Sequence, residues 1–297
     1  MGLRSAEGNR HYAPRAGCLQ GRHKLVFKGG TSLEMMRIIQ RFSEDLDLLV
    51  VGDYASKNSA KRALKAMITS AESATGGNAQ DVRSGGNLGT LHRSAYLSMP
   101  LGNNAEGISD PNAILIELGQ AGGPKPSLSR TVKSLLGRQL AKTDVGEWDD
   151  LAAFEVTVLH PGRILIEKLL RVNNFVVDPA RRSTTHGLPR IGRQLYDIWA
   201  LLGEQMVIGL PGDKPQFGEI LRSAFEVSEI FTPDWPVPAG GFASSVAFDP
   251  AGQFAAELRQ EHERAMRDLH YGEVSPPSFD DVPNRIHSNS HVLQPSE

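Results

Sequence analysis

The sequence predicts an α/β (α+β) N-terminal half built on a mixed sheet, followed by a mainly helical C-terminal half. Short apolar runs separated by glycine, proline and polar turns are typical of strands, and they extend to about residue 159. After His160-Pro161 the apolar residues recur at helical spacing instead. We therefore expect an N-terminal arm over 1–24, an α/β domain over 25–159, a helical domain over 160–272 and an extended tail over 273–297.

The individual elements are placed by their turn residues and by the spacing of their apolar residues. Gly29-Gly30 ends a short apolar strand, and Thr31 or Ser32 can cap the helix that follows. In chain order, we expect strands at 24–27, 46–51, 78–84, 91–99, 113–118 and 154–159, a polar loop at 103–111, and helices at 31–40, 59–73, 127–141, 163–172, 190–203, 217–225 and 251–269.

Composition indicates a protein of the cytoplasm. No apolar run approaches the roughly 20 residues that a membrane-spanning helix needs, so no membrane association is expected. The N-terminal segment lacks the apolar core of a secretory signal. Cys18 is the single cysteine, which excludes an internal disulfide framework.

Basic residues are clustered although the net charge is only −2. Such clusters either bind a polyanion or are solvated helix faces, and the sequence leaves both interpretations open. The clusters are Lys57, Lys61, Arg62 and Lys65; Arg130, Lys133, Arg138 and Lys142; and Arg181, Arg182, Arg190 and Arg193.

The glycine pair Gly29-Gly30 is the first part of a candidate nucleotide site. It precedes a predicted helix, whose N-terminal amide groups and dipole favour a phosphate. Glycine has no Cβ, so a ligand can approach the backbone closely. Thr31 or Ser32 can add a hydrogen bond to a phosphate, whereas no histidine–acid pair near them supports a role as nucleophile.

Asp45 and Asp47 are the second part of this site. Being two residues apart on a predicted strand, they point to the same face of it. Two such carboxylates suit Mg²⁺ or Mn²⁺, which in turn binds a nucleoside triphosphate (NTP). Glu117, the acid in the apolar run AILIEL, is the candidate third ligand. A glycine turn or a D-x-D pair is a weak signal alone, but together they predict metal-dependent nucleotidyl transfer.

The runs KGGTSL at 28–33 and RFSEDLDL at 41–48 resemble the AbiEii/AbiGii toxin family, a branch of the DNA polymerase β-like nucleotidyltransferases. HPGRILIEKLLRV at 160–172 and RQLYDIWALL at 193–202 are similar to later motifs of that family, and the resemblance extends over about residues 25–282. Within the family the chain is similar to the mycobacterial MenT-type toxins. It departs from the family in its short, non-helical segment before Lys28.

This resemblance implies a polymerase β-like core and a metal-dependent enzyme that acts as the toxin of a toxin–antitoxin or phage-defence pair. The implied reaction transfers a nucleoside monophosphate from an NTP to the 3′ end of tRNA and blocks translation. A cognate antitoxin is the implied protein partner, and DNA is not an expected one. The implied phosphate-binding residues are Lys28, Gly29, Gly30, Thr31 and Ser32, and the implied catalytic residues are Asp45, Asp47, Lys168 and Asp197.

Without the resemblance, Lys168 and Asp197 have ordinary structural explanations. Lys168 lies on the narrow polar strip of an otherwise apolar helix, where it can snorkel or form a salt bridge. Asp197 borders an apolar stripe and can pair with Arg190 or Arg193. Histidine spacing does not suggest zinc, and His160, which precedes a proline, is typical of a helix start.

Two other functions remain open from the sequence. One is a nucleotidyltransferase that acts on a small molecule or a protein, and the basic segment 127–141 favours RNA over it. The other is a module that has lost catalysis and acts by binding a partner, which the intact Asp45/Asp47 pair argues against.

Overall fold

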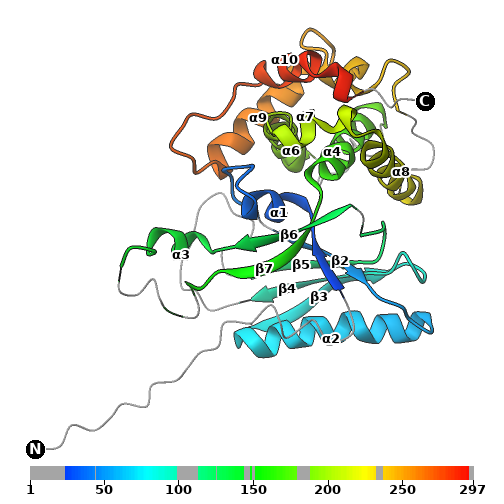
Figure 1. Cartoon of the computed structure of the whole chain (residues 1–297), viewed down its shortest axis with the longest axis vertical. Coiled ribbons are helices and arrows are strands. Elements are labelled where there is room, and N and C mark those ends of the chain that lie inside the picture. Colours follow the sequence, from blue (N-terminus) through cyan, green and yellow to red (C-terminus); the bar gives the residue numbers. More distant parts are fainter. Residues whose placement is uncertain are drawn as a thin grey trace, which may run out of the picture.

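The computed structural model describes residues 24–43, 45–98, 113–124, 126–143, 148, 151–178, 188–231 and 237–293, with the backbone alone for 188–190 and 227–231. Within these residues the chain forms a seven-stranded sheet with helices on both faces (Figure 1). The polar loop predicted at 103–111 lies outside the described residues.

The sheet is mixed, as predicted, with the strand order β3-β4-β5-β2-β1-β7-β6. The β2–β5 and β1–β7 pairs are parallel, and the other neighbouring pairs are antiparallel. The strands are β1 (Lys24–Phe27), β2 (Asp45–Val51), β3 (Asn78–Gly85), β4 (His92–Ser98), β5 (Ala113–Gly119), β6 (Ser127–Val132) and β7 (Phe154–Leu159). All except β6 form close to where the apolar runs and turn residues predict them.

The two faces of the sheet pack against different helices. Leu48 and Val50 of β2 belong to a buried cluster with the apolar side of α2 (Lys57–Thr75), which covers one face. Leu49 belongs to the core shared with the helical half on the opposite face. Because strand side chains alternate, odd-numbered residues of β2 face the helical half and not α2.

The helical half surrounds α4 (Pro161–Val177), which is buried on nearly all sides, as its sequence predicts. His160 caps this helix, because its Nδ1 accepts a hydrogen bond from Gly162 N at 3.0 Å. The prediction of His160 as a helix-start residue is therefore confirmed. The other helices of this half are α6 (Leu188–Leu201), α7 (Gln205–Ile208), α8 (Lys214–Phe231), α9 (Ala255–Leu269) and α10 (Asp281–Ser288), with short 3₁₀ turns η4 (Leu210–Gly212), η5 (Phe242–Ser244), η6 (Val246–Phe248) and η7 (Ser290–Val292).

A glycine allows α6 to lie directly on α9. A Cβ at Gly192 would overlap the carbonyl oxygen of Glu261 on α9, so a larger residue would push the two helices apart. This close crossing determines where the polar residues of α6 that follow Gly192 are placed.

The hydrophobic core is continuous across the boundary predicted near residue 160. Val26, Leu33 and Leu49 of the sheet half lie in the same buried cluster as residues of α4, α6 and α9. Each fully buried side chain of this size contributes about 1.5–3 kcal/mol relative to an exposed one. The two halves therefore hold each other in a defined position.

The helix after the glycine pair begins and ends earlier than predicted. α1 extends over Gly29–Met35 instead of 31–40. It ends because Arg37 adopts a left-handed conformation with φ +61°, and Ile38 N then bonds to Leu33 O at 2.9 Å.

The prediction of a basic helix over 127–141 is wrong for most of that range. Ser127–Val132 is strand β6, paired along its length with β7, and only Leu135–Gln139 is helical (α3). Leu128 and Val132 are four residues apart, and side chains at this spacing share one face of a strand and nearly share one face of a helix. The apolar spacing thus could not separate the two, and pairing with β7 decided the structure.

The segment after Gly272 is not simply extended, contrary to the prediction. It contains α10 and η7, and Val282, Ile286 and Val292 are buried in the main core. These apolar residues are few and widely spaced, so they give only a short helical signal. Within the described parts of the chain, no helix is long and apolar enough to cross a membrane.

Candidate active site

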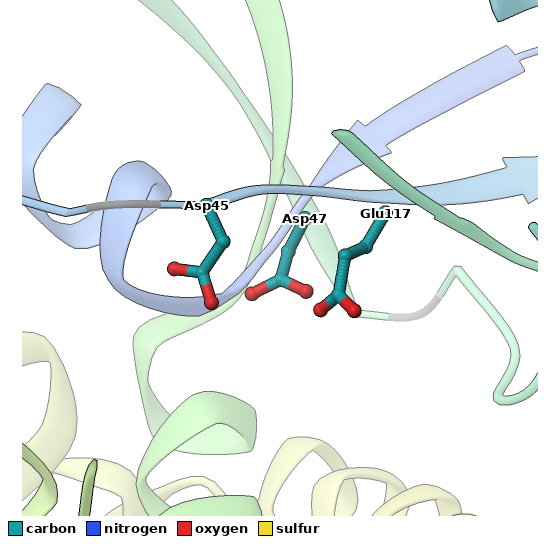
Figure 2. Close-up of side chains that lie close together, drawn as sticks. All are labelled: Asp45, Asp47 and Glu117. Carbon is teal, nitrogen blue, oxygen red and sulfur yellow. The ribbon is translucent and has the colours of Figure 1, made fainter. Parts of the chain in front are cut away.

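The predicted acids come together on the face of the sheet that points to the helical half. β2 and β5 are parallel neighbours, and Asp47 lies directly opposite Glu117. Each of Asp45, Asp47 and Glu117 offers a carboxylate oxygen within 4.8 Å of the others. Figure 2 shows the three side chains next to one another and pointing the same way. Among the described residues, this is the one group of three potential metal ligands of this kind.

The charges around Glu117 indicate that a cation fits between the acids. Burial and the nearby charges of Asp47 and Asp45 raise the pKa of Glu117, and Arg83 offsets this only in part. Arg193 Nη2 lies 3.3 Å from Asp45 Oδ2 at the other end of the group. Even with an arginine at each end, the carboxylates repel one another. A divalent cation bound by their hard oxygen ligands would relieve that repulsion.

The glycine turn is pressed directly against the acids. Gly29 has φ +67°, and a Cβ there would overlap Asp47 Oδ2, so no other residue fits without a shift. Lys28 N donates to Asp47 O at 3.1 Å, which connects the turn to β2. The backbone of the turn therefore lies directly against Asp47.

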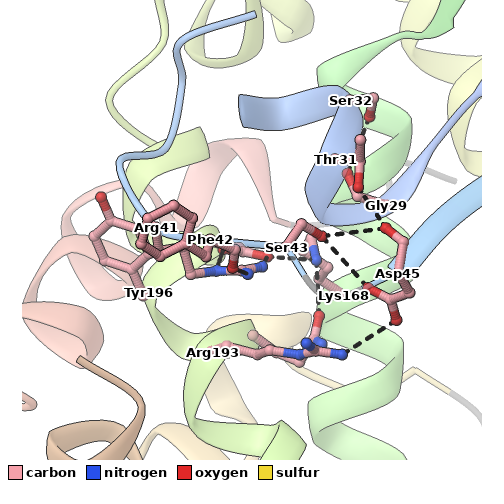
Figure 3. Close-up of polar contacts among 12 residues, drawn as sticks. Gly29, Thr31, Ser32, Arg41, Phe42, Ser43, Asp45, Lys168, Arg193 and Tyr196 are labelled. Carbon is pink, nitrogen blue, oxygen red and sulfur yellow. Dashed lines mark hydrogen bonds and ion pairs between the residues drawn. The ribbon is translucent and has the colours of Figure 1, made fainter. Parts of the chain in front are cut away.

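The two hydroxyl groups after the turn brace it. Thr31 Oγ1 donates to Asp45 O, and Ser32 Oγ donates to Gly29 O at 3.0 Å (Figure 3). Neither caps α1, whose N-cap is Lys28 without a side-chain hydrogen bond. Ser32 is fully buried, so its hydroxyl supports the turn from behind and does not line the surface that a phosphate would reach.

A buried ion-pair cluster lies behind the turn. Arg41 holds both oxygens of Asp197, with Nε to Oδ1 at 2.7 Å and Nη2 to Oδ2 at 2.6 Å. Lys168 Nζ lies 2.6 Å from Asp197 Oδ2 and donates to Gln194 Oε1 at 2.8 Å. A Cβ at Gly30 would be 2.8 Å from Arg41 Nη2, so the guanidinium packs against the turn itself.

The placement of Asp197 selects among the roles considered from the sequence. Its side chain is 0% exposed and holds Arg41 and Lys168, so it supports the site from the interior. Arg193, one of its expected structural partners, pairs with Asp45 instead. Figure 3 shows Arg41, Lys168 and Arg193 gathered around Ser43 and Asp45.

In this cluster the single carboxylate of Asp197 pairs with two cations, Arg41 and Lys168. These charges, together with burial, shift the pKa values of the Asp197 and Lys168 side chains. Burial opposes ionisation of Asp197, but Arg41 and Lys168 outweigh it and hold the pKa of that carboxyl below its ordinary 3.8. Burial lowers the pKa of Lys168, and the charge of Arg41 adds to this, while Asp197 offsets it in part.

Arg41 and Arg193 belong to the site, although sequence reasoning gave neither a role there. Arg41 is held in place by an extended segment, in which Phe42 N bonds to Leu269 O at 2.9 Å and Tyr271 N to Gln40 O at 3.0 Å. Arg193 was assigned to a surface cluster, but it is buried. Its spacing of four residues from Asp197 places both on one side of α6, which is the signal that could have identified it.

Among the described members of the three basic clusters, Arg193 lies beside the acids, whereas the first cluster lies on the other face of the sheet. Lys57, Lys61, Arg62 and Lys65 are exposed on α2, which covers the opposite face of the sheet. Arg138 of the second cluster pairs with Glu34 at 2.9 Å, and Glu34 also accepts from Tyr271. Arg181 and Arg182 of the third cluster lie outside the described residues.

Comparisons with known proteins give a family-model match that covers most of the chain. The model of the family described as "Nucleotidyl transferase AbiEii toxin, Type IV TA system" matches residues 15–285. Among solved structures, JHP933 from Helicobacter pylori aligns with 82% of this chain and 85% of its own, at 11% sequence identity and a TM-score of 0.32. No curated protein matches the chain.

Proposed function

Because the chain belongs to the AbiEii family of nucleotidyl transferase toxins of type IV toxin–antitoxin systems, we propose that it transfers a nucleoside monophosphate from an NTP to the 3′ end of a tRNA. The observation that carries this proposal is the group of Asp45, Asp47 and Glu117 directly beside the Gly29-Gly30 turn. These three acids would hold Mg²⁺ or Mn²⁺. When bound, the metal supplies charge neutralisation at the phosphates and at the attacking and leaving oxygens.

The residues of the chain have separate roles in the proposed reaction. The glycine turn lets the backbone lie directly against Asp47, where any side chain would collide, so NTP phosphates bound at the turn would lie next to the acids. The RNA 3′-hydroxyl loses its proton to solvent as its oxygen bonds to the α-phosphorus, the bond from that phosphorus to the α–β bridging oxygen breaks, and pyrophosphate leaves. Asp197 and Gln194 orient Lys168, whose charge stabilises the phosphates in the transition state.

Incubation with α-labelled NTPs, Mg²⁺ and total tRNA tests this proposal directly. We expect label on tRNA, added nucleotides at its 3′ end on sequencing, and no label after removal of divalent cations with EDTA. Label on protein alone would overturn the RNA acceptor and favour a protein nucleotidyltransferase. In cells, we expect expression to stop growth and a cognate antitoxin to restore it.

A Lys168→Met protein separates the catalytic role of this lysine from a structural one. Asp197 keeps both bonds to Arg41 in the variant, so no charge is left without a partner and the stability should change little. The rate of transfer should fall by about 100-fold or more, because the positive charge proposed to stabilise the phosphates is lost. Steady-state kinetics and thermal unfolding measure the two effects.

Lys61→Met is the matched control, because Lys61 is exposed on α2 at the opposite face of the sheet. It should leave transfer unchanged. A Lys168→Met protein with the wild-type rate would show that Lys168 has only a structural role.

A further inference from the structure

A row of four side chains runs across the sheet from the acids to its edge. Asp47 of β2 lies opposite Glu117 of β5, Glu117 opposite Ser94 of β4, and Ser94 opposite Arg83 of β3. Contacts follow this row, since Ser94 Oγ donates to Glu117 Oε1 at 3.4 Å and Arg83 Nη2 lies 3.8 Å from the same oxygen. Arg83 therefore reaches the acids from the edge strand.

An irregularity in β3 is what turns Arg83 to this face. Asp81 pairs with Ala95 and Arg83 with Ser94, so Val82 is an extra residue between two consecutive partners. In a regular strand Val82 would stand opposite Ser94, and Arg83 would point to the α2 face. Bulges re-aim side chains in this way and are frequent beside active sites.

Arg83 differs from Arg193, the arginine at the other end of the acids, in its freedom to move. The Arg83 side chain is 68% exposed, whereas that of Arg193 is 5% exposed. An exposed ion pair as long as that of Arg83 with Glu117 contributes little to stability. Arg83 can therefore leave Glu117 for a stronger anionic partner at small cost.

The position of Arg83 indicates which substrate it meets. The Gly29-Gly30 turn follows β1, which lies on one side of β2, whereas β5, β4 and β3 lie on the other side. If the NTP phosphates occupy the glycine turn, the side with Arg83 is left for the acceptor. Arg83 is itself exposed on this side, and among the described residues no residue of β3, β4 or β5 joins the core shared with the helical half.

We propose that Arg83 binds a backbone phosphate of the RNA strand that delivers its 3′-hydroxyl to the acids. A guanidinium group forms paired hydrogen bonds with a phosphate, which suits it to position a nucleic-acid strand. This inference rests on the proposed function and adds to it the side from which the acceptor enters.

Arg83→Gln and Arg83→Lys test the inference in the full chain. We expect Arg83→Gln to weaken binding of fluorescently labelled total tRNA, measured by anisotropy with Mg²⁺ present, by about tenfold. The KM for tRNA should rise by a similar factor, while the KM for NTP and the thermal unfolding temperature stay the same. The slope of log affinity against log salt should fall by about one, and Arg83→Lys should restore part of the binding.

Arg222→Gln is the matched control, since Arg222 on α8 belongs to none of the basic clusters, is 66% exposed and pairs with Glu226 at 3.7 Å, much as Arg83 pairs with Glu117. It should bind tRNA like the wild type. Wild-type tRNA binding by Arg83→Gln would overturn the inference, as would an effect confined to Mg²⁺ or NTP affinity, which would mean that Arg83 acts through Glu117. A wild-type protein that neither binds nor labels tRNA would overturn the proposed function itself, and the acceptor role of Arg83 with it.

Discussion

An Asp47→Asn protein is expected to lose nucleotidyl transfer by about 1,000-fold or more while remaining folded. Asp47 is the central acid of the group, opposite Glu117 and against the Gly29-Gly30 turn. Metal ions contribute several kcal/mol to such reactions, and each 1.36 kcal/mol corresponds to tenfold in rate. Initial rates of label transfer to tRNA at saturating Mg²⁺ measure the loss.

The thermal stability of the Asp47→Asn protein, unlike its activity, should not fall. Asp47 raises the pKa of Glu117 by repulsion, so the amide relieves strain between like charges when no metal is present. We expect the thermal unfolding temperature in EDTA to be equal to or above that of the wild type. We also expect that added Mn²⁺ stabilises the wild type but not the variant.

Asp53→Asn is the control for this variant. Asp53 is exposed just beyond the end of β2, so its loss changes the net charge by the same amount without touching the acids. It should leave both rate and Mn²⁺ stabilisation unchanged. An Asp47→Asn protein with more than about a tenth of wild-type activity would contradict the assignment of the metal site, since a lost ligand costs far more than this.

Asp197→Ala is expected to destabilise the fold by about 3–5 kcal/mol. The substitution leaves Arg41 and Lys168 buried without the carboxylate that holds them together. A loss of this size is a large share of the 5–15 kcal/mol that typically stabilises a folded protein. Urea unfolding followed by linear extrapolation gives the change in the free energy of unfolding.

The chain offers a matched surface pair as control. Asp280 accepts two hydrogen bonds of 2.7 and 2.8 Å from Arg259, so it is bound at both oxygens as Asp197 is by Arg41, but both side chains are exposed. Asp280→Ala should therefore cost far less stability than Asp197→Ala. Equal losses in the two variants would mean that burial of the Asp197 cluster is not what makes it important.

The contribution of Asp197 should also depend on pH. Its partners hold its pKa below the ordinary 3.8, so its stabilisation is fully present above that value. It is lost as the pH falls through the lowered pKa, because the protonated carboxyl no longer balances two cations. The difference in unfolding free energy between wild type and Asp197→Ala should thus narrow in acid and stay constant near neutral pH.

Much of the site was determined by local sequence. The acid–apolar–acid alternation of β2 placed Asp45 and Asp47 on one face, because strand side chains alternate whatever lies around them. A single acid in the apolar run of β5 marked Glu117, since a buried strand seldom carries one without reason. The glycine pair marked the turn, because only glycine leaves that space beside the backbone.

The tertiary structure decided which distant groups complete the site. Arg41 and Asp197 lie 156 residues apart, and no periodic pattern shows which cation will balance a buried acid. Arg83 reaches Glu117 only through one irregular residue in β3, and pairing with β7 made a strand of β6 where a helix was expected. Local sequence determines the spacing of apolar residues and the residues that form turns. Strand register and the pairing of buried charges depend instead on contacts between segments that are remote along the chain.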